Sequence, residues 1–177
     1  MASDVVIPQE LGELTVTQDD RTICACAGGI TATIDKAYGS ITFYDEAGHI
    51  LLREDQRRPC VLQEKPVLVN TFSGQGEITL RQSVDGVRAS ADDYETHEAR
   101  KAYACKQSFS FAVEEGLYGL GSHEEGYGNL RGKTRELYQH NMKAVVPVLV
   151  STKGWGMLFD LGCMMVFHDD AEGSYLY

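Results

Sequence analysis

The residues best suited to chemistry lie together at 137–142, in the sequence Leu-Tyr-Gln-His-Asn-Met. An aromatic ring, two amides and an imidazole can bind a sugar, because the ring stacks on the sugar face and the polar groups both donate to and accept from hydroxyls. Asn141 and His140 are the candidates for such contacts. The alternative is a strand end whose polar side chains satisfy only the neighbouring backbone, and the spacing alone favours this alternative.

Other motifs lack the context that their chemistry requires. Gly119-Leu120-Gly121 is not followed by the strand-to-helix turn of a dinucleotide-binding site. His123-Glu124-Glu125 has no second histidine one helical turn away, and Cys24 with Cys26 cannot close a tetrahedral site, so no metal is expected. The chain has no G-x-S-x-G elbow, and its 26 acidic residues form no pair that stands out. We therefore assign no catalytic residue and no cofactor.

The candidate residues follow a Gly-rich segment, since six of the 18 glycines fall between Gly116 and Gly132. Glycine permits a positive φ and a close approach of the backbone to another domain or to a ligand. This segment is expected to be a loop outside the core, and the one best suited to face a partner.

The elements that must position this loop are strands. Apolar and polar residues alternate with period two in many short segments, which is typical of half-buried strands, and no segment has a sustained helical period. A hairpin is expected around residues 45–49, and the charged stretch 92–101 is expected to be a loop or a single helical turn. The pattern predicts an all-β fold, an antiparallel β-sandwich or a barrel. The expected strands are 14–17, 30–35, 41–44, 50–53, 78–84, 108–113, 145–152, 155–160 and 163–168.

Length and charge limit the class of protein. The 177 residues, 43% of them hydrophobic, are ordinary for one globular domain, which we expect to span residues 1–177. A formal charge of −10 disfavours nucleic acid and anionic membranes as partners. The N-terminus carries no basic and apolar leader, and the five cysteines are an odd number, so we expect a cytoplasmic protein with reduced thiols.

Residues 117–160 resemble glycoside hydrolase family 31, which contains α-glucosidases and α-xylosidases. The resemblance rests on Leu-Tyr-Gly-Leu-Gly at 117–121, on a Gly-rich loop ending in Asn-Leu-Arg-Gly-Lys at 129–133, and on Val-Pro-Val-Leu-Val-Ser-Thr-Lys-Gly-Trp-Gly-Met-Leu-Phe-Asp at 146–160. The order of the expected strands in residues 30–113 is compatible with it. Trp155 stands where the family usually has Tyr, and we expect it to be a core residue.

The resemblance implies that the chain is the N-terminal β-sandwich of a retaining glycosidase, similar to the galactose-mutarotase supersandwich. In this family the region precedes a (β/α)₈ barrel that carries the nucleophile and the acid/base aspartate, and this chain ends at Tyr177 before any barrel strand. The implied role is non-catalytic: to pack on the barrel and lend a loop to a site for terminal α-glucose or α-xylose. Carried over by position, Asn141 would bind a substrate hydroxyl, with His140 beside it. Met142 departs from the family pattern, in which Asp often stands near this position.

Two other functions stay open. A stand-alone aldose mutarotase needs a general base and an imidazole acid in one cleft, and His140 and His168 supply imidazoles while no motif places the base. A free carbohydrate-binding module would carry several exposed aromatic residues on one sheet face. The expected partners are a carbohydrate and the catalytic barrel of the same enzyme, and the sequence does not distinguish glucose from xylose.

Overall fold

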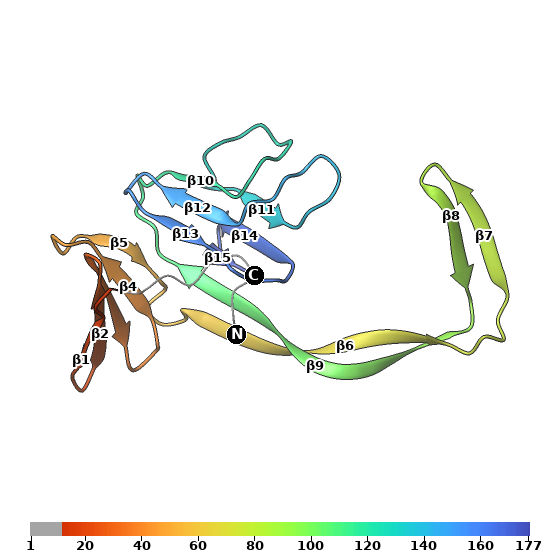
Figure 1. Cartoon of the computed structure of the whole chain (residues 1–177), viewed down its shortest axis with the longest axis horizontal. Coiled ribbons are helices and arrows are strands. Elements are labelled where there is room, and N and C mark those ends of the chain that lie inside the picture. The colour runs from red at the N-terminus through yellow and green to blue at the C-terminus, as the bar shows by residue number, and fades with distance from the viewer. Residues whose placement is uncertain (1–11) are drawn as a thin grey trace. The chain divides into compact units, whose positions relative to one another are not determined.

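The structure, a computed structural model, describes residues 12–177 as strands and connecting loops (Figure 1). The chain divides into two compact units, one made of the residues up to Val61 together with Cys105–Tyr177, the other of Leu62–Ala104. Within the described residues there are fifteen strands and no helix. Residues 12–177 accordingly include no helix long and apolar enough to cross a membrane.

A meander of five antiparallel strands forms the N-terminal sheet, in the order β1-β2-β3-β4-β5. Its strands are β1 (Thr15–Gln18), β2 (Thr22–Ala27), β3 (Ile30–Asp35), β4 (Ile41–Tyr44) and β5 (Ile50–Arg53). The expected hairpin is confirmed, since Phe43 lies opposite Leu52 and Asp45 accepts a hydrogen bond from the His49 amide at 2.8 Å. Gly48 has a φ of 81° in this connection, a conformation in which glycine is unstrained.

Two further antiparallel sheets share the main hydrophobic core of the same unit. The smaller has the order β10-β12-β13, and the larger has the order β11-β14-β15-β9-β6. Their strands are β6 (Cys60–Phe72), β9 (Tyr94–Phe109), β10 (Leu117–Gly119), β11 (Thr134–Leu137), β12 (Val148–Ser151), β13 (Gly156–Leu158), β14 (Met165–Asp170) and β15 (Gly173–Leu176). Leu117 and Leu149 from the smaller sheet and Phe167 from the larger sheet are fully buried in this core. The prediction of an all-β antiparallel sandwich is confirmed.

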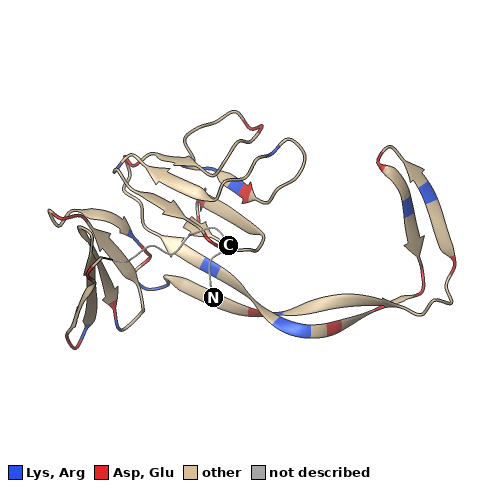
Figure 2. Ribbon diagram, in the orientation of Figure 1, with Lys and Arg blue, Asp and Glu red and all other residues tan. Residues whose placement is uncertain are grey.

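The unit Leu62–Ala104 holds most of β6 and β9, together with a separate hairpin of β7 (Ile78–Ser83) and β8 (Gly86–Ala91). None of its residues is buried. Charged residues lie along its strands (Figure 2), and the Lys101 ammonium lies 2.6 Å from the Glu64 carboxylate. Large apolar side chains are exposed in it as well, namely Leu62, Leu68, Val69, Phe72, Ile78, Leu80, Val84, Val87, Tyr94 and Tyr103.

The expectation of a loop or a helical turn at residues 92–101 is wrong, because Tyr94–Phe109 form one continuous strand, β9. Both faces of this strand are exposed over residues 94–101, so neither face requires apolar residues and the alternation of a half-buried strand is missing. The strand expected at 108–113 ends early, at Phe109. The chain turns there, since the Ala112 amide donates to the Glu115 carboxyl at 2.9 Å.

Candidate functional site

Two glycines allow the segment that follows β10 to lie against the chain that enters β12. Gly119 has a φ of 101°, and a Cβ at this position would clash with the carbonyl oxygen of Val148. Gly121 has a φ of 96°, and a Cβ there would clash with the carbonyl oxygen of Ala144. No side chain fits at either position. Glycine is thus required at both residues, for a positive φ and for close approach to another segment of the same chain. The expectation of a loop outside the core is wrong, because this segment contains β10 and because Leu117, Leu120 and Leu130 are fully buried in the core.

This close approach brings two loops together. Ser122 and Ala144 form an isolated antiparallel bridge, in which each amide donates to the carbonyl of the other at 2.8 and 2.9 Å. The bridge holds the Gly-rich loop beside the loop of residues 138–147, which joins β11 to β12. His140 and Asn141, the residues that the sequence singles out, lie in this second loop.

Residues 140–143 form a tight turn, in which the amide of Lys143 donates to the carbonyl of His140 at 3.1 Å. Gln139 braces the turn, since its side-chain amide donates to the Lys143 carbonyl and its side-chain carbonyl accepts a further backbone amide at 3.1 Å. Met142 has a φ of 63°, a left-handed conformation that costs a non-glycine residue on the order of 1–2 kcal/mol. The contacts on both sides therefore hold the turn in a strained conformation.

His140 and Asn141 are exposed beside an open hollow of about 470 Å³, which is lined by Ser122 and by residues 139–144. The imidazole of His140 lies against the ring of Tyr138, with 5.0 Å between the ring centres. Among residues 12–177, none forms a hydrogen bond with the side-chain amide of Asn141. The structure thus brings the sequence-predicted residues together, with the amide of Asn141 open to a ligand.

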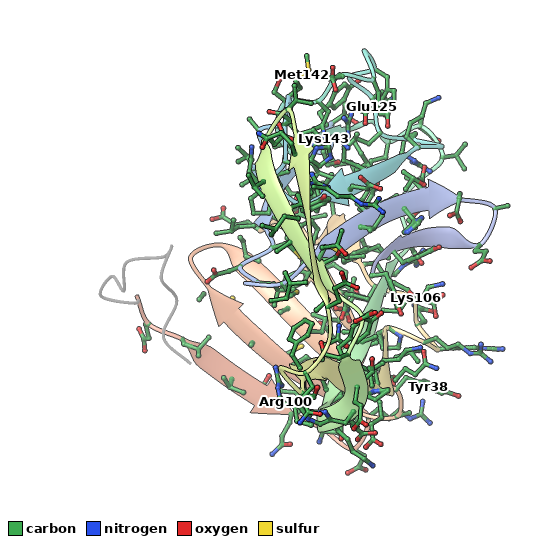
Figure 3. All side chains as sticks on the ribbon, turned by 90° about the vertical axis from the view of Figure 1, so that its right-hand side faces the viewer. Tyr38, Arg100, Lys106, Glu125, Met142 and Lys143 are labelled. Carbon is green, nitrogen blue, oxygen red and sulfur yellow. The ribbon has the colours of Figure 1, made fainter. Side chains whose placement is uncertain are left out.

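A group of charged side chains lies beside the hollow, which Lys143 lines. The Lys143 ammonium lies 3.2 Å from the Glu136 carboxylate and 3.9 Å from that of Glu125 (Figure 3). The side chain of Arg135 is only 5% exposed and donates to Glu125 at 2.7 Å. The pKa of Glu125 is lowered first by a hydrogen bond from the Glu125 backbone and then by the positive charges of Arg135 and Lys143. The two positive and two negative side chains neutralise one another. The polar groups that remain for contact with a ligand are therefore those of the turn at residues 140–143.

A buried polar network fixes the start of the Gly-rich segment. Glu115 is 4% exposed, and its carboxyl accepts hydrogen bonds from the Ser151 hydroxyl at 2.5 Å, the Trp155 indole at 3.1 Å and the Ala112 amide at 2.9 Å. The Trp155 ring also stacks on Phe111. Trp155 is 9% exposed, which confirms the expectation that it is a core residue.

The end of the same segment is fixed by an ion pair. Arg131 donates to the Asp169 carboxylate at 2.9 Å and to two backbone carbonyls at 2.6 and 2.9 Å. Burial raises the pKa of Asp169, but hydrogen bonds from Ser174 and Gly132 and the charge of Arg131 outweigh it and hold the pKa below its ordinary value of 3.8. Both ends of the loop are therefore rigidly attached to the core.

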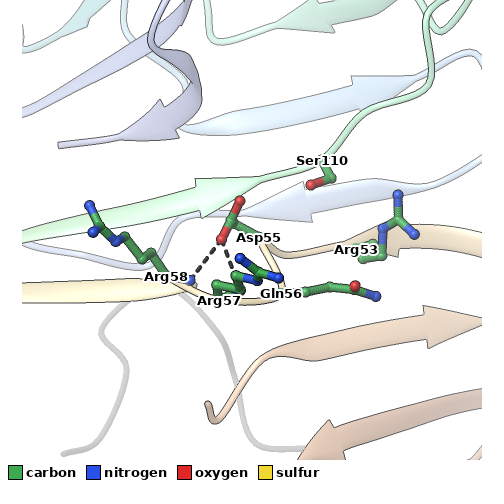
Figure 4. A pocket seen from close by; sticks show the side chains of 6 residues that line it. All are labelled: Arg53, Asp55, Gln56, Arg57, Arg58 and Ser110. Atoms are coloured by element: carbon green, nitrogen blue, oxygen red, sulfur yellow. Dashed lines mark hydrogen bonds between the residues drawn. The ribbon is translucent and has the colours of Figure 1, made fainter.

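A second hollow, of about 450 Å³, lies beside β5 and is lined by three arginines (Figure 4). The Asp55 carboxylate accepts the backbone amides of Arg58 at 2.7 Å and Arg57 at 3.0 Å, and these bonds lower its pKa. The side chains of Arg53 and Arg58 point to different sides of the hollow (Figure 4), so the guanidinium groups do not converge on one ligand.

Residues 12–177 include no group of three or more His, Cys, Asp or Glu side chains that could hold a metal ion.

Sequence reasoning identifies the turn but not the residues that hold it. Ser122 and Lys143 belong to no motif, and the partner of Ser122 lies 22 positions away along the chain, at Ala144. The sequence feature that could have identified Lys143 is its charge. Lys143 follows the candidate segment directly, and the acidic residues at 125 and 136 can pair with it.

No protein-family model matches the chain. Two curated proteins are similar in sequence. An uncharacterized family 31 glucosidase of Pseudescherichia vulneris is 26% identical over 159 residues, a match that covers 90% of this chain and 28% of that protein. An α-xylosidase of Saccharolobus solfataricus is 29% identical over 103 residues, which cover 52% of this chain and 14% of that protein. The chain therefore spans less than a third of the length of these relatives.

Among solved structures, a family 31 α-xylosidase from a soil metagenome, in complex with xylose, has the same fold over 100% of this chain and 24% of its own length. The TM-score is 0.68 and the sequence identity is 24%. The chain is thus related in sequence to the glycosidases of glycoside hydrolase family 31, and its fold is that of a part of a family 31 enzyme.

Proposed function

We propose that the chain is the non-catalytic N-terminal β-sandwich of a retaining α-glycosidase that hydrolyses terminal α-linked glucose or xylose. Residues 1–177 pack on a separate catalytic barrel and lend the turn at 140–143 to the sugar site. The parent enzyme acts on O-glycosyl bonds, whereas this region alone is inactive. The observation that carries the proposal is the match to a family 31 glucosidase over 90% of this chain but only 28% of that protein.

The turn at residues 140–143 supports a role in sugar binding. The side-chain amide of Asn141 can both donate and accept, as a hydroxyl partner requires, and no described residue occupies it. Tyr138, 45% exposed, and the ring of His140 supply adjacent flat surfaces for a sugar ring. Strained residues such as Met142 persist where the surroundings enforce them, and such residues cluster at ligand sites.

The unit Leu62–Ala104 supports packing against a further domain. Ten large apolar side chains are exposed among its residues, and none of its residues is buried. Contiguous exposed apolar surface marks sites of contact with another protein or domain, and the proposal assigns these side chains to such a contact. The relationship to family 31 favours the catalytic barrel as that partner.

The register of β11 with β14 argues against a stand-alone mutarotase. His140 lies beyond Leu137, which pairs with Met165 at the first position of β14. His168 lies three residues further along β14 and pairs with Thr134. The two imidazoles therefore lie toward opposite ends of this strand pair, and the hollow lined by His140 is not lined by His168.

The purified chain tests the non-catalytic role. Assayed with p-nitrophenyl α-glucoside and α-xyloside, it is expected to release no nitrophenol, because it supplies neither a nucleophile nor an acid/base pair. It is also expected to leave the rate of glucose mutarotation, followed by polarimetry, unchanged. Release of nitrophenol would contradict the proposal, and faster mutarotation would establish the mutarotase in its place.

The role of the turn is tested with Asn141→Ala in the full-length enzyme. Loss of a hydrogen bond to a substrate hydroxyl costs ~1–3 kcal/mol, so kcat/KM should fall about 5- to 150-fold while the melting temperature stays unchanged.

Asn129→Ala is the matched control, because the Asn129 side chain accepts the backbone amides of Leu117 and Arg131 at 3.2 and 3.1 Å. This variant should lower the melting temperature and leave the kcat/KM of the folded enzyme unchanged. If Asn141→Ala behaves as Asn129→Ala does, Asn141 is a structural residue and not part of the sugar site.

A further inference from the structure

Two thiols face each other across neighbouring strands of the larger sheet. Cys60 is the first residue of β6 and Cys105 lies on β9, and their sulfur atoms are 3.5 Å apart. The two strands are fixed close to this point, since the Ser108 amide donates to the carbonyl of Pro59 at 2.8 Å. Both cysteines are exposed, so small oxidants can reach them.

The other cysteines of the described chain lack such an arrangement. Cys24 and Cys26 lie two positions apart on β2, and their sulfur atoms contact the hydroxyls of Thr33 and Thr31 at 3.4 and 3.5 Å. Residues i and i+2 of one extended strand are about 6.5–7 Å apart at Cα, at the upper limit that a disulfide can bridge. Cys163 lies near enough to Cys105 to affect its titration. It is therefore the thiol that competes with Cys60 for a bond to Cys105.

We propose that Cys60 and Cys105 are a modification site that forms a reversible disulfide between β6 and β9. Such a bond would close the chain around residues 61–104, which include the whole of the unit Leu62–Ala104. The sulfur atoms are 3.5 Å apart, against about 2.05 Å in a disulfide, so a small rotation of the two exposed side chains brings the sulfurs into bonding range.

The order of the two steps follows from the surroundings of the sulfurs. Although the residue is exposed, partial desolvation of its sulfur atom and the neighbouring thiol of Cys60 raise the pKa of Cys105 to about 11. The thiolate is the attacking form, so the raised pKa disfavours a first attack by Cys105, and the scheme is written with Cys60 attacking first.

The oxidant in this scheme is a low-molecular-weight disulfide, RSSR. The Cys60 thiolate attacks one sulfur of RSSR, forms a mixed disulfide and releases RS⁻. Cys105 then loses its proton, attacks the sulfur of Cys60 and expels the second RS⁻. Two protons end on the two RS⁻ groups, and two electrons pass from the protein thiols to RSSR, so the net products are one protein disulfide and two RSH.

The experiment uses the reduced 177-residue chain, exposed to oxidised glutathione and then alkylated, digested and analysed by mass spectrometry without reductant. The expected product is a peptide pair joined through Cys60 and Cys105, with Cys24 and Cys26 alkylated. Dithiothreitol should reverse the bond. Because the disulfide closes a loop of 45 positions, the oxidised chain should melt on the order of 5–10 °C higher than the reduced chain.

Two variants separate this site from general thiol oxidation. Cys105→Ser should stop at the mixed disulfide of Cys60 with glutathione and should show no rise in melting temperature. Cys24→Ser, the matched control, should form the Cys60–Cys105 bond as the unmodified chain does. A dominant link to Cys163, a link between two chains, or alkylation of both Cys60 and Cys105 after oxidation would each overturn the proposal.

Discussion

The buried carboxyl of Glu115 offers a sharp test of how the Gly-rich segment is held. Its two oxygens accept three hydrogen bonds, from Ser151, Trp155 and the backbone of Ala112. Glu115→Gln keeps the shape of the side chain and replaces one acceptor oxygen with a donor. The change therefore isolates the hydrogen bonds from the packing.

The amide of the new glutamine can keep its oxygen toward Ser151 and Trp155, which leaves the Ala112 amide facing another donor. A buried donor without a partner costs about 1–3 kcal/mol. Ala112 is only half-buried, so water can partly replace the lost acceptor, and we expect a loss of about 1–2 kcal/mol in the free energy of unfolding. With a urea m-value of about 2 kcal/mol/M, the unfolding midpoint should fall by about 0.5–1 M.

Trp155 makes the measurement specific, because it is the one tryptophan of the chain and its indole N–H donates to Glu115. Urea unfolding followed by tryptophan fluorescence therefore reports on this network. Glu114→Gln is the matched control, since Glu114 is exposed and its replacement should change stability by less than about 0.5 kcal/mol. If the two variants unfold at the same urea concentration, the Glu115 network does not hold the segment.

Three further results are expected. Gly121→Ala should lower the melting temperature more than Gly126→Ala does. Both glycines have a positive φ, but only a Cβ at position 121 would meet a backbone carbonyl. Equal melting temperatures of the two variants would contradict this. Met142→Gly should raise stability by about 0.5–1 kcal/mol by relieving the left-handed strain, whereas Met142→Ala should not, as thermal unfolding of both variants will show. The pKa of Asp169 is lowered in the folded chain, so its stabilising effect is present above the ordinary value of 3.8 and is lost as the pH falls through the lower folded value. Asp169→Asn should therefore lower stability at pH 7 and flatten its decline in acid, and an unchanged decline would be contrary to this reasoning.

The N-terminal meander shows which strands a sequence can reveal. The expected strand at residues 30–35 coincides with β3, because its side chains alternate and its sheet is partly buried. The sequence indicates β2 only in part: Cys24 and Cys26 are expected on one face of a strand, but the Cys and Ala residues of Thr22–Ala27 carry a weak strand preference and its bounds are not predicted. Residues 94–101 of β9 are not recognised for another reason, because both of their faces are exposed and leave no period to detect.

The candidate site is predictable in its residues but not in its construction. His140 and Asn141 lie in one exposed turn, as their mixed polar and aromatic surroundings indicate. The bridge between Ser122 and Ala144 is a long-range pairing that no local pattern encodes. The positive φ at Met142 is hidden as well, because methionine does not signal a left-handed residue in the way that glycine does.

Gly121 and Met142 both adopt a positive φ, but only at Gly121 do the surroundings exclude a side chain. At Gly121 the carbonyl of Ala144 leaves no room for a Cβ, so the fold itself requires glycine. Met142 is 75% exposed, and glycine would adopt its conformation at lower cost. Folding therefore does not account for the methionine, whose side chain stands beside Asn141 at the rim of the hollow. If the proposed role of the turn in sugar binding is correct, the apolar thioether of Met142 would lie against the apolar face of the sugar ring, and Met142→Gly would then lower kcat/KM of the full-length enzyme while it raises stability.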